Sequence, residues 1–283
     1  MFDDQRVDTT GVRDRRGRGG LAIGGGAGVL GLVVYLLMSL LGGGSGFQLP
    51  GGTSLSGTGE TLEQLEARCN TDGAIDKYND CYLIKVYNEI NEVWSATLEG
   101  YRQPALGFFE NGVQTGCGAA SSQVGPFYCP PDQEIFIDIG FLQQLQEEFG
   151  ANGRYAQAYI LAHETGHHLQ TLLGTERDVR TAQQRSPSRA NELSIKMELQ
   201  ADCYAGVWGK LADERGNVSI TEQQLDEALN AAAAVGDDRI QQKTQGQIDR
   251  ESWTHGSAEQ RRAWYLKGFQ SGDLDACDTF ESL

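Results

Sequence analysis

Three of the four histidines in this chain of 283 residues fall within one hexapeptide, His-Glu-Thr-Gly-His-His at 163–168. Its first five residues form an H-E-x-x-H motif. On an α-helix, His163 and His167 lie one turn apart on the same face, so both rings can bind one metal ion. Glu164, next to the first ligand, can act as general base on a metal-bound water. The motif therefore predicts a helix that carries a zinc hydrolase site.

The sequence around the motif favours the required helix. Residues 154–173 contain no proline and many good helix formers, and Gly174 after them is a natural C-terminal stop. Gly166 is a local weakness in that helix, and a small residue there permits close packing near the metal. His168 points about 100° away from His167 on a helix. We therefore expect His168 to be a packing or surface residue rather than a ligand.

The third zinc ligand is expected to be a carboxylate. Catalytic zinc usually takes three protein ligands and keeps one position for water. The metzincin pattern would place a glycine and a third histidine where this chain has Gln170 and Leu173, so that class is excluded. The inverted order H-x-x-E-H does not occur in the sequence either. A carboxylate on a later helix, as in thermolysin-like enzymes, is the remaining expectation.

Residues 190–211 form a second predicted helix with suitably spaced acidic residues. Glu198 and Asp202 are four residues apart and share one helical face. We expect Glu198 to be the third ligand of one Zn²⁺ ion. Asp202 is then expected to hold the N–H of a ligating histidine, His163, and so to fix the tautomer of its ring. The alternative is an accidental motif, because acidic pairs at this spacing are common on exposed helices.

These motifs resemble the putative neutral zinc metallopeptidases of bacteria, a family of single-pass membrane-anchored proteins. The H-E-x-G-H-H motif of that family reads HETGHH here, and its E-L-Q-A-D-C-x-A-G segment reads ELQADCYAG at 198–206. Segments 125–141 and 254–273 are similar to the family as well. The resemblance covers essentially the whole chain. It implies a gluzincin-like zinc endopeptidase with the ligands and general base inferred above, and it implies no particular substrate.

The fourth histidine, His255, lies far from the others in sequence. Ser257 and Gln260 form a capping box, so we expect a helix to begin there, with His255 just before it and Arg261 in its second turn. Prenyl-protein endopeptidases and related membrane zincins look similar at this spacing. By that resemblance, His255 is expected to donate to the oxyanion of the transition state, and Arg261 to support His255 or contact a substrate carboxylate. Alternatively, His255 caps the helix and Arg261 makes a surface ion pair.

The N-terminal sixth of the chain predicts a membrane anchor. Residues 21–41 carry no charge and are long enough to span a bilayer. Arginines precede them closely, which favours a cytoplasmic arm at 1–20 and an extracytoplasmic catalytic domain. A cleaved signal peptide is the less favoured alternative, because its apolar region would be unusually long and no A-x-A site follows. The formal net charge of −16 argues against nucleic acid as a partner.

All six cysteines follow the apolar segment. An even number on the exported side of a membrane indicates disulfides. Locality favours two short-range pairs and leaves one long-range pair: Cys69–Cys81, Cys117–Cys129 and Cys203–Cys277. The alternative is that some cysteines are free buried thiols, especially Cys203 beside Asp202.

The rest of the chain is organised as a tether and one domain. Residues 42–60 are rich in Gly, Ser and Thr and are expected to be a flexible linker. Residues 61–283 are expected to form an α+β, mostly helical, zincin-like domain with a small antiparallel sheet. Strands are predicted at 105–109 and 134–139. Strand 134–139 is expected at the sheet edge, where it would bind a peptide substrate by strand addition; a plain core strand is the alternative.

Together these features predict a membrane-anchored zinc endopeptidase that acts on protein or peptide substrates. A non-catalytic zinc-binding scaffold or adaptor of the cell envelope is the alternative. The sequence leaves the oligomeric state, the regulation and the physiological substrate open.

Overall fold

The computed structural model describes residues 2, 6–16, 60–149, 153–216 and 218–280 of the chain. Its helices are α2 (Leu62–Cys69), α3 (Ala74–Lys77), α4 (Asn79–Thr97), α5 (Ile139–Phe149), α6 (Arg154–Leu173), α7 (Thr175–Arg185), α8 (Ala190–Glu214), α9 (Glu222–Ala234), α10 (Asp237–Gln245) and α11 (Ala258–Ser271). Its strands are β1 (Val12–Asp14), β2 (Ala105–Phe109), β3 (Gly112–Thr115), β4 (Gly118–Ser121), β5 (Phe127–Cys129) and β6 (Glu134–Asp138). The domain is therefore mostly helical, as predicted.

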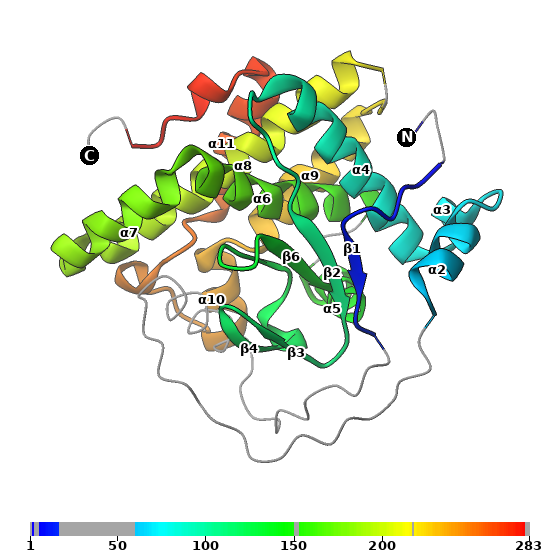
Figure 1. Cartoon of the computed structure of the whole chain (residues 1–283). Helices are drawn as coiled ribbons and strands as arrows, with labels where there is room; N and C mark the ends of the chain where they lie inside the picture. Colours follow the sequence, from blue (N-terminus) through cyan, green and yellow to red (C-terminus); the bar gives the residue numbers. More distant parts are fainter. Residues whose placement is uncertain (1, 3–5, 17–59, 150–152, 217, 281–283) are drawn as a thin grey trace.

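Helices α4, α6, α8, α9 and α11 gather on one side of the strands (Figure 1). The closest crossing joins α8 to α11 at two glycines. A Cβ atom at Gly206 would lie 2.0 Å from the carbonyl oxygen of Tyr265, and one at Gly268 would lie 2.0 Å from that of Cys203. No side chain fits in either place, so the two backbones are in direct contact. This crossing brings the first turns of α11 over the part of α8 that carries the acidic pair.

The main sheet has four strands in the order β1-β2-β6-β5. Strands β1 and β2 are parallel, β2 and β6 are parallel, and only β5 runs antiparallel to β6. The prediction of an antiparallel sheet is therefore wrong. Parallel neighbours require long connections. Along the sequence, helices α2, α3 and α4 come between β1 and β2, and strands β3, β4 and β5 come between β2 and β6. A separate pair, β3 and β4, forms an antiparallel hairpin.

The prediction that strand 134–139 lies at the sheet edge and binds a peptide substrate there is also wrong. Strand β6 lies between β2 and β5, so both of its edges are hydrogen-bonded within the sheet. Its five residues are all buried, which fits a core strand. The edge strand on the side of α6 is β5, which packs against that helix.

The predicted arm at 1–20 supplies part of the sheet. Its residues 12–14 form β1, and two of its arginines reach a buried glutamate of β6. Arg13 forms an ion pair of 2.5 Å with Glu134, and Arg15 binds the other carboxylate oxygen. Glu134 is only 1% exposed, so these arginines neutralise a charge that would otherwise be costly to bury. The described residues of the arm thus belong to the same fold as the rest of the domain.

The expected transmembrane helix is not found. None of the helices in the described part of the chain is long and apolar enough to cross a membrane. The predicted helix at 21–41 lies outside the described residues, as does the predicted linker at 42–60 apart from Glu60. Within the described residues, the fold class is accordingly corrected to a mostly helical domain with a mixed sheet and a hairpin.

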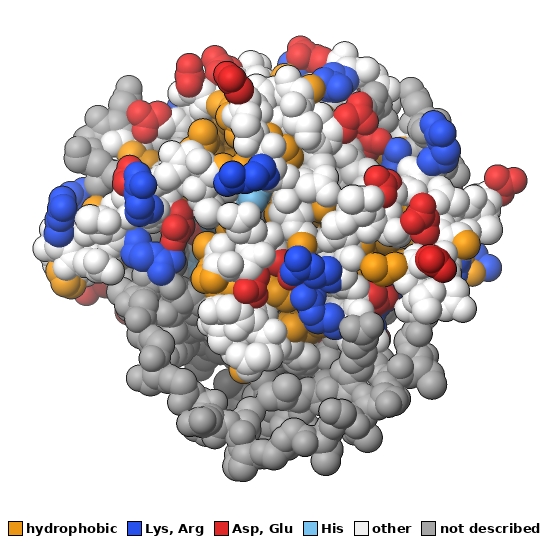
Figure 2. All heavy atoms as spheres, in the orientation of Figure 1, with side chains coloured by type: hydrophobic (Ala, Val, Ile, Leu, Met, Phe, Trp, Pro, Cys, Tyr) orange, Lys and Arg blue, Asp and Glu red, His pale blue; other side chains and the backbone are white. Residues whose placement is uncertain are grey.

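Three disulfides join the six cysteines in the predicted pairs: Cys69–Cys81, Cys117–Cys129 and Cys203–Cys277. The third pair ties α8 to the 3₁₀ turn η4 (Leu274–Cys277) that follows α11. Figure 2 shows acidic and basic side chains interspersed over the face seen in Figure 1, so the net charge of −16 is not concentrated at one place on that face.

Candidate metal centre

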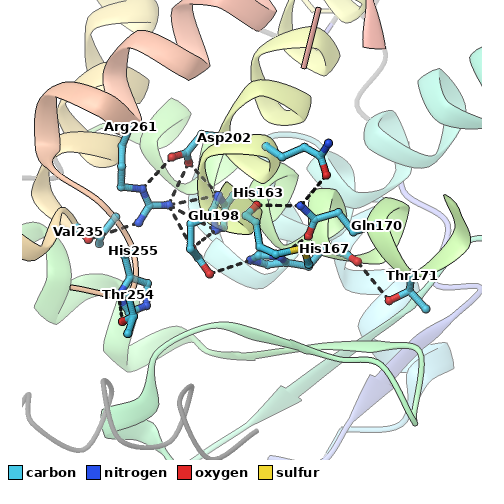
Figure 3. A network of polar contacts seen from close by, with 12 residues as sticks. His163, His167, Gln170, Thr171, Glu198, Asp202, Val235, Thr254, His255 and Arg261 are labelled. Atoms are coloured by element: carbon cyan, nitrogen blue, oxygen red, sulfur yellow. Dashed lines mark hydrogen bonds and ion pairs between the residues drawn. The ribbon is translucent and has the colours of Figure 1, made fainter. Parts of the chain in front are cut away.

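Helices α6 and α8 bring two histidines and one carboxylate to a common point (Figure 3). The Nε2 atom of His163 lies 3.2 Å from one oxygen of Glu198, and Nε2 of His167 lies 3.5 Å from the other. The two rings are nearly perpendicular, with an interplanar angle of 86°. Ligand atoms of all three residues lie within 4.8 Å of one another. Two imidazole nitrogens and a carboxylate are a typical donor set for catalytic zinc, so these residues fit that ion.

The close approach of α6 and α8 depends on Gly166, inside the H-E-x-x-H motif. A Cβ atom there would lie 3.0 Å from the Cα and carbonyl oxygen of Ala201 on α8. A side chain at this position would therefore make the contact between the helix of the histidines and the helix of Glu198 tighter than is normal, and one of the two would have to shift slightly. Packing, rather than helix propensity, therefore explains a glycine in the middle of this helix.

A buried network lies behind His163. Its Nδ1–H donates to Asp202 at 2.8 Å, as expected for the partner of a ligating ring. The hydroxyl of Tyr159 donates to the same carboxylate at 2.6 Å. Arg261 binds both oxygens of Asp202, through Nε at 2.8 Å and Nη2 at 2.9 Å. Because a carboxylate can only accept here, Nδ1 of His163 carries a proton, and Nε2 is the nitrogen that can bind a metal once its own proton is lost.

Arg261 lies in a different place from that expected. We expected it to support His255 or to contact substrate, but its side chain is 3% exposed and its guanidinium pairs with Asp202. The α8–α11 crossing explains this position, because it brings the start of α11 into contact with Asp202 on α8. The alternative of a surface ion pair is excluded by the burial. The role of Tyr159 could not be read from the sequence, since its hydrogen bond to Asp202 joins two helices that are distant in sequence.

The second histidine has a partner that the sequence analysis missed. Nδ1 of His167 lies 2.8 Å from Oε1 of Gln170, one turn further along α6. The amide nitrogen of Gln170 donates to the carbonyl of Met197 at 2.8 Å and to Gln200 at 3.1 Å. In the sequence, Gln170 stands where the metzincin pattern has a glycine. Its i,i+3 spacing from His167 was the available signal.

His255 approaches the site from the loop before α11. Oδ2 of Asp237, in the first turn of α10, accepts the backbone N–H groups of Thr254, His255 and Gly256 at 2.6–2.9 Å. Its Oδ1 lies 3.2 Å from Nδ1 of His255. Figure 3 shows His255 on the side of Glu198 opposite to Thr171, at one end of the row of site residues. Asp237 therefore fixes both the loop and the ring. After Tyr159 and Gln170, it is the third residue that sequence reasoning missed.

His168 faces away from the metal ligands and is fully buried. Its Nε2 donates to the carbonyl of Arg102 at 2.6 Å, and its Nδ1 accepts from the hydroxyl of Tyr128 at 3.0 Å. Tyr128 belongs to the edge strand β5, so His168 ties the motif helix to that strand. It is thus a packing residue with two hydrogen bonds, not a third imidazole ligand.

Burial and charge shift the pKa values of the site in different directions. Burial alone would lower the pKa of His163, but Asp202 and Glu198 outweigh it and raise the pKa to about 9. Burial raises the pKa of Glu164 to about 7, against a backbone hydrogen bond from Tyr128. Burial would also raise the pKa of Glu198, but the histidines hold it well below its ordinary value. Without metal, His163 therefore retains a proton near neutral pH.

The described residues include one other group with potential metal ligands, Cys69, Asp80 and Cys81. Its two sulfur atoms form a disulfide. Asp80 is paired with Arg68 at 2.8 Å and with Arg16 at 2.9 Å. The disulfide leaves no thiolate to bind a metal, and the arginines neutralise the carboxylate. This cluster therefore stabilises the fold and is not a metal site.

Comparison with known proteins agrees with this geometry. A family model described as "Putative neutral zinc metallopeptidase" matches residues 2–280. The uncharacterized protein YpfJ of Escherichia coli (strain K12) is 39% identical over 285 residues, which cover 97% of both chains. The uncharacterized protein Rv2575 of Mycobacterium tuberculosis is 43% identical over 225 residues, covering 76% of this chain and 75% of that one. No solved structure matches the chain.

Proposed function

Because the chain belongs to the "putative neutral zinc metallopeptidase" family, we propose that it is a zinc-dependent endopeptidase of the gluzincin type. The observation that carries the proposal is the convergence of His163, His167 and Glu198 within 4.8 Å. Glu164 lies next to the first of these ligands on the same helix. We assign His163, His167 and Glu198 as the ligands of one zinc ion, which supplies a Lewis acid and lowers the pKa of a water in the site to about 7.

Glu164 is the proposed general base and acid. In the metal-free site, burial raises the pKa of Glu164 to about 7, so its carboxylate is a stronger base than an exposed one. It accepts a proton from the water as that water attacks the peptide carbonyl, and it then delivers the proton to the leaving amine. The backbone of Tyr128 on β5 lowers the pKa of Glu164, so this edge strand lies close to the general base, which supports placing the substrate along it.

His255 is the proposed donor to the oxyanion. Burial alone would lower its pKa, but Asp237 and the charge of Glu198 raise it above the ordinary value. The protonated ring donates from Nδ1 to Asp237 and has Nε2–H left for the developing negative charge. Asp202 and Arg261 then act outside the ligand set, where they hold His163 in place.

We also propose that the domain works outside the cytoplasm. All six cysteines are joined in disulfides, and such bonds persist mainly in oxidising compartments. Alkylation of free thiols in intact cells, before lysis, tests this point. Quantitative protection of the six cysteines is the expected result, and full alkylation would contradict the location.

The function is tested with Glu164→Gln in the full-length chain. The variant keeps the ligands, so it should contain as much zinc as the wild type while cleavage of a dye-labelled unfolded protein falls by about 10²–10⁴-fold. Glu99→Gln is the matched control, since Glu99 is exposed and lies after α4. If the wild type binds zinc but cleaves no better than Glu164→Gln, the chain is a zinc-binding scaffold or adaptor instead.

A further inference from the structure

We infer that Gln170 is a positioning residue that fixes the tautomer of His167, and that Gln200 and the disulfide-held carbonyl of Cys277 in turn fix Gln170. This inference rests on the proposed zinc site and extends it to the C-terminal end of the domain. A histidine binds zinc only through an unprotonated nitrogen, and the hydrogen bond at the other nitrogen decides which one that is.

The orientation of the Gln170 amide follows from a backbone carbonyl. The carbonyl of Met197 can only accept, and it lies 2.8 Å from one end of the amide. That end must therefore be the NH₂ group, and the oxygen must face His167, whose Nδ1 is 2.8 Å away. An amide oxygen can only accept, so Nδ1 of His167 must carry the proton. The lone pair of Nε2 is then directed at Glu198.

The same argument fixes the next link. Nε2 of Gln200 lies 3.1 Å from the carbonyl of Cys277, so this end of Gln200 must be its NH₂ group. Its oxygen then faces Gln170 and accepts from that amide at 3.1 Å. The backbone carbonyls of Met197 and Cys277 thus determine which side-chain atoms carry protons in Gln200, Gln170 and His167.

Burial and the third disulfide make the path rigid. Gln170 is 0% and Gln200 6% exposed, so water does not compete strongly for these hydrogen bonds. Cys277 is covalently tied to Cys203 on α8, one turn from Gln200. The C-terminal segment therefore contributes no ligand, but it holds the chain of amides that orients one.

Among the described residues, Gln170 is the hydrogen-bond partner of Nδ1 in His167, and replacing Gln170 removes that partner. The ring is then free to rotate or to place its proton on Nε2, where it would face Glu198 and block a metal. Loss of such a partner typically costs about 10–100-fold in metal affinity. The effect should be strongest for Gln170 and smaller, in the same direction, for Gln200.

The first test reads the tautomer directly. Long-range ¹H–¹⁵N spectra of the metal-free, full-length wild type at pH 8 should resolve individual rings, because the chain has only four histidines. The His167→Asn spectrum assigns the ring. We expect Nδ1 to be protonated and Nε2 to be bare in His167. The opposite pattern would overturn the inference, and this result does not depend on zinc binding or on activity.

The second test uses Gln170→Met and Gln200→Met, which keep the side-chain length and remove the hydrogen bonds. Gln183→Met is the matched control, because Gln183 is a buried glutamine of α7 that bonds to Ala190 and Ser194 instead. Zinc affinity is measured by chelator competition, and the ligand geometry by the visible spectrum of the cobalt-loaded protein.

We expect Gln170→Met to bind zinc about 10–100-fold more weakly than wild type and to shift the cobalt spectrum. Gln183→Met should be less stable than the wild type but should have the same zinc affinity and the same cobalt spectrum. Equal zinc affinities and equal spectra for the Gln170 and Gln183 variants would contradict the positioning role. If instead the wild type binds no zinc, the proposed function fails, and the tautomer of His167 alone decides the inference.

Discussion

Arg261 donates hydrogen bonds to both carboxylate oxygens of Asp202, at 2.8 and 2.9 Å, and both side chains are buried. Asp202 in turn accepts the Nδ1 proton of the proposed ligand His163. The charge that orients the ligand is therefore compensated from α11 rather than by water. This makes the metal centre dependent on the α8–α11 crossing, and it leads to the first prediction.

Arg261→Met should destabilise the domain strongly. Removal of one partner of a buried ion pair leaves an uncompensated charge, at a typical cost of about 3–5 kcal/mol in the free energy of unfolding. Urea denaturation of the metal-free protein measures this cost. Arg177→Met is the control, since Arg177 pairs with Asp178 at the surface with 79% of its side chain exposed, and it should cost about 0–1 kcal/mol. Equal midpoints for the two variants would show that Asp202 does not need Arg261.

Zinc binding should release protons at pH 7. Without metal, the pKa of His163 is about 9, so at pH 7 its ring is protonated and the metal must displace that proton. Affinity should accordingly rise with pH up to about 9 and fall as the pH is lowered. Calorimetric titration at pH 7 in two buffers with different ionisation enthalpies measures the number of protons released. Identical heats in both buffers would contradict the assigned protonation state.

His255→Ala should lower the turnover number while zinc stays bound. Loss of one oxyanion donor typically costs about 10²–10³-fold in kcat. Because the pKa of His255 lies above 6.5, the donor is present at lower pH and is lost as the pH rises through the raised value. Wild-type kcat should therefore fall on the alkaline side, and the variant should lack that limb. Unchanged kcat, or an unchanged alkaline limb, would remove His255 from the mechanism.

Local spacing explains what the sequence could predict. The pairs His163/His167 and Glu198/Asp202 each share a helical face because four residues make about one turn, and the structure places them together. The capping box at Ser257 is present at the start of α11. The short disulfides follow from proximity along the chain, and the long one then follows by elimination. These features need only the geometry of one element.

Contacts between distant elements could not be read from the sequence. The partner of Arg261 depends on where α11 crosses α8, and that crossing depends on the two glycines at 206 and 268. Asp237 reaches His255 only because α10 folds back on the loop before α11. Strand 134–139 is an inner strand because of its place in the sheet, between β2 and β5. The alternation of side chains along a strand does not reveal which strands are its neighbours. Tyr159 and Asp237 were missed for this reason, whereas Gln170 lies only three residues from His167 on the same helix.

The central claim is that His163, His167 and Glu198 hold one zinc ion, and metal analysis tests it most directly. The full-length wild type, loaded with zinc and then passed over a desalting column, should retain one zinc per chain. Glu198→Ala should retain markedly less under the same conditions. A wild type without stoichiometric zinc, or a Glu198→Ala variant with as much zinc as the wild type, would contradict the account.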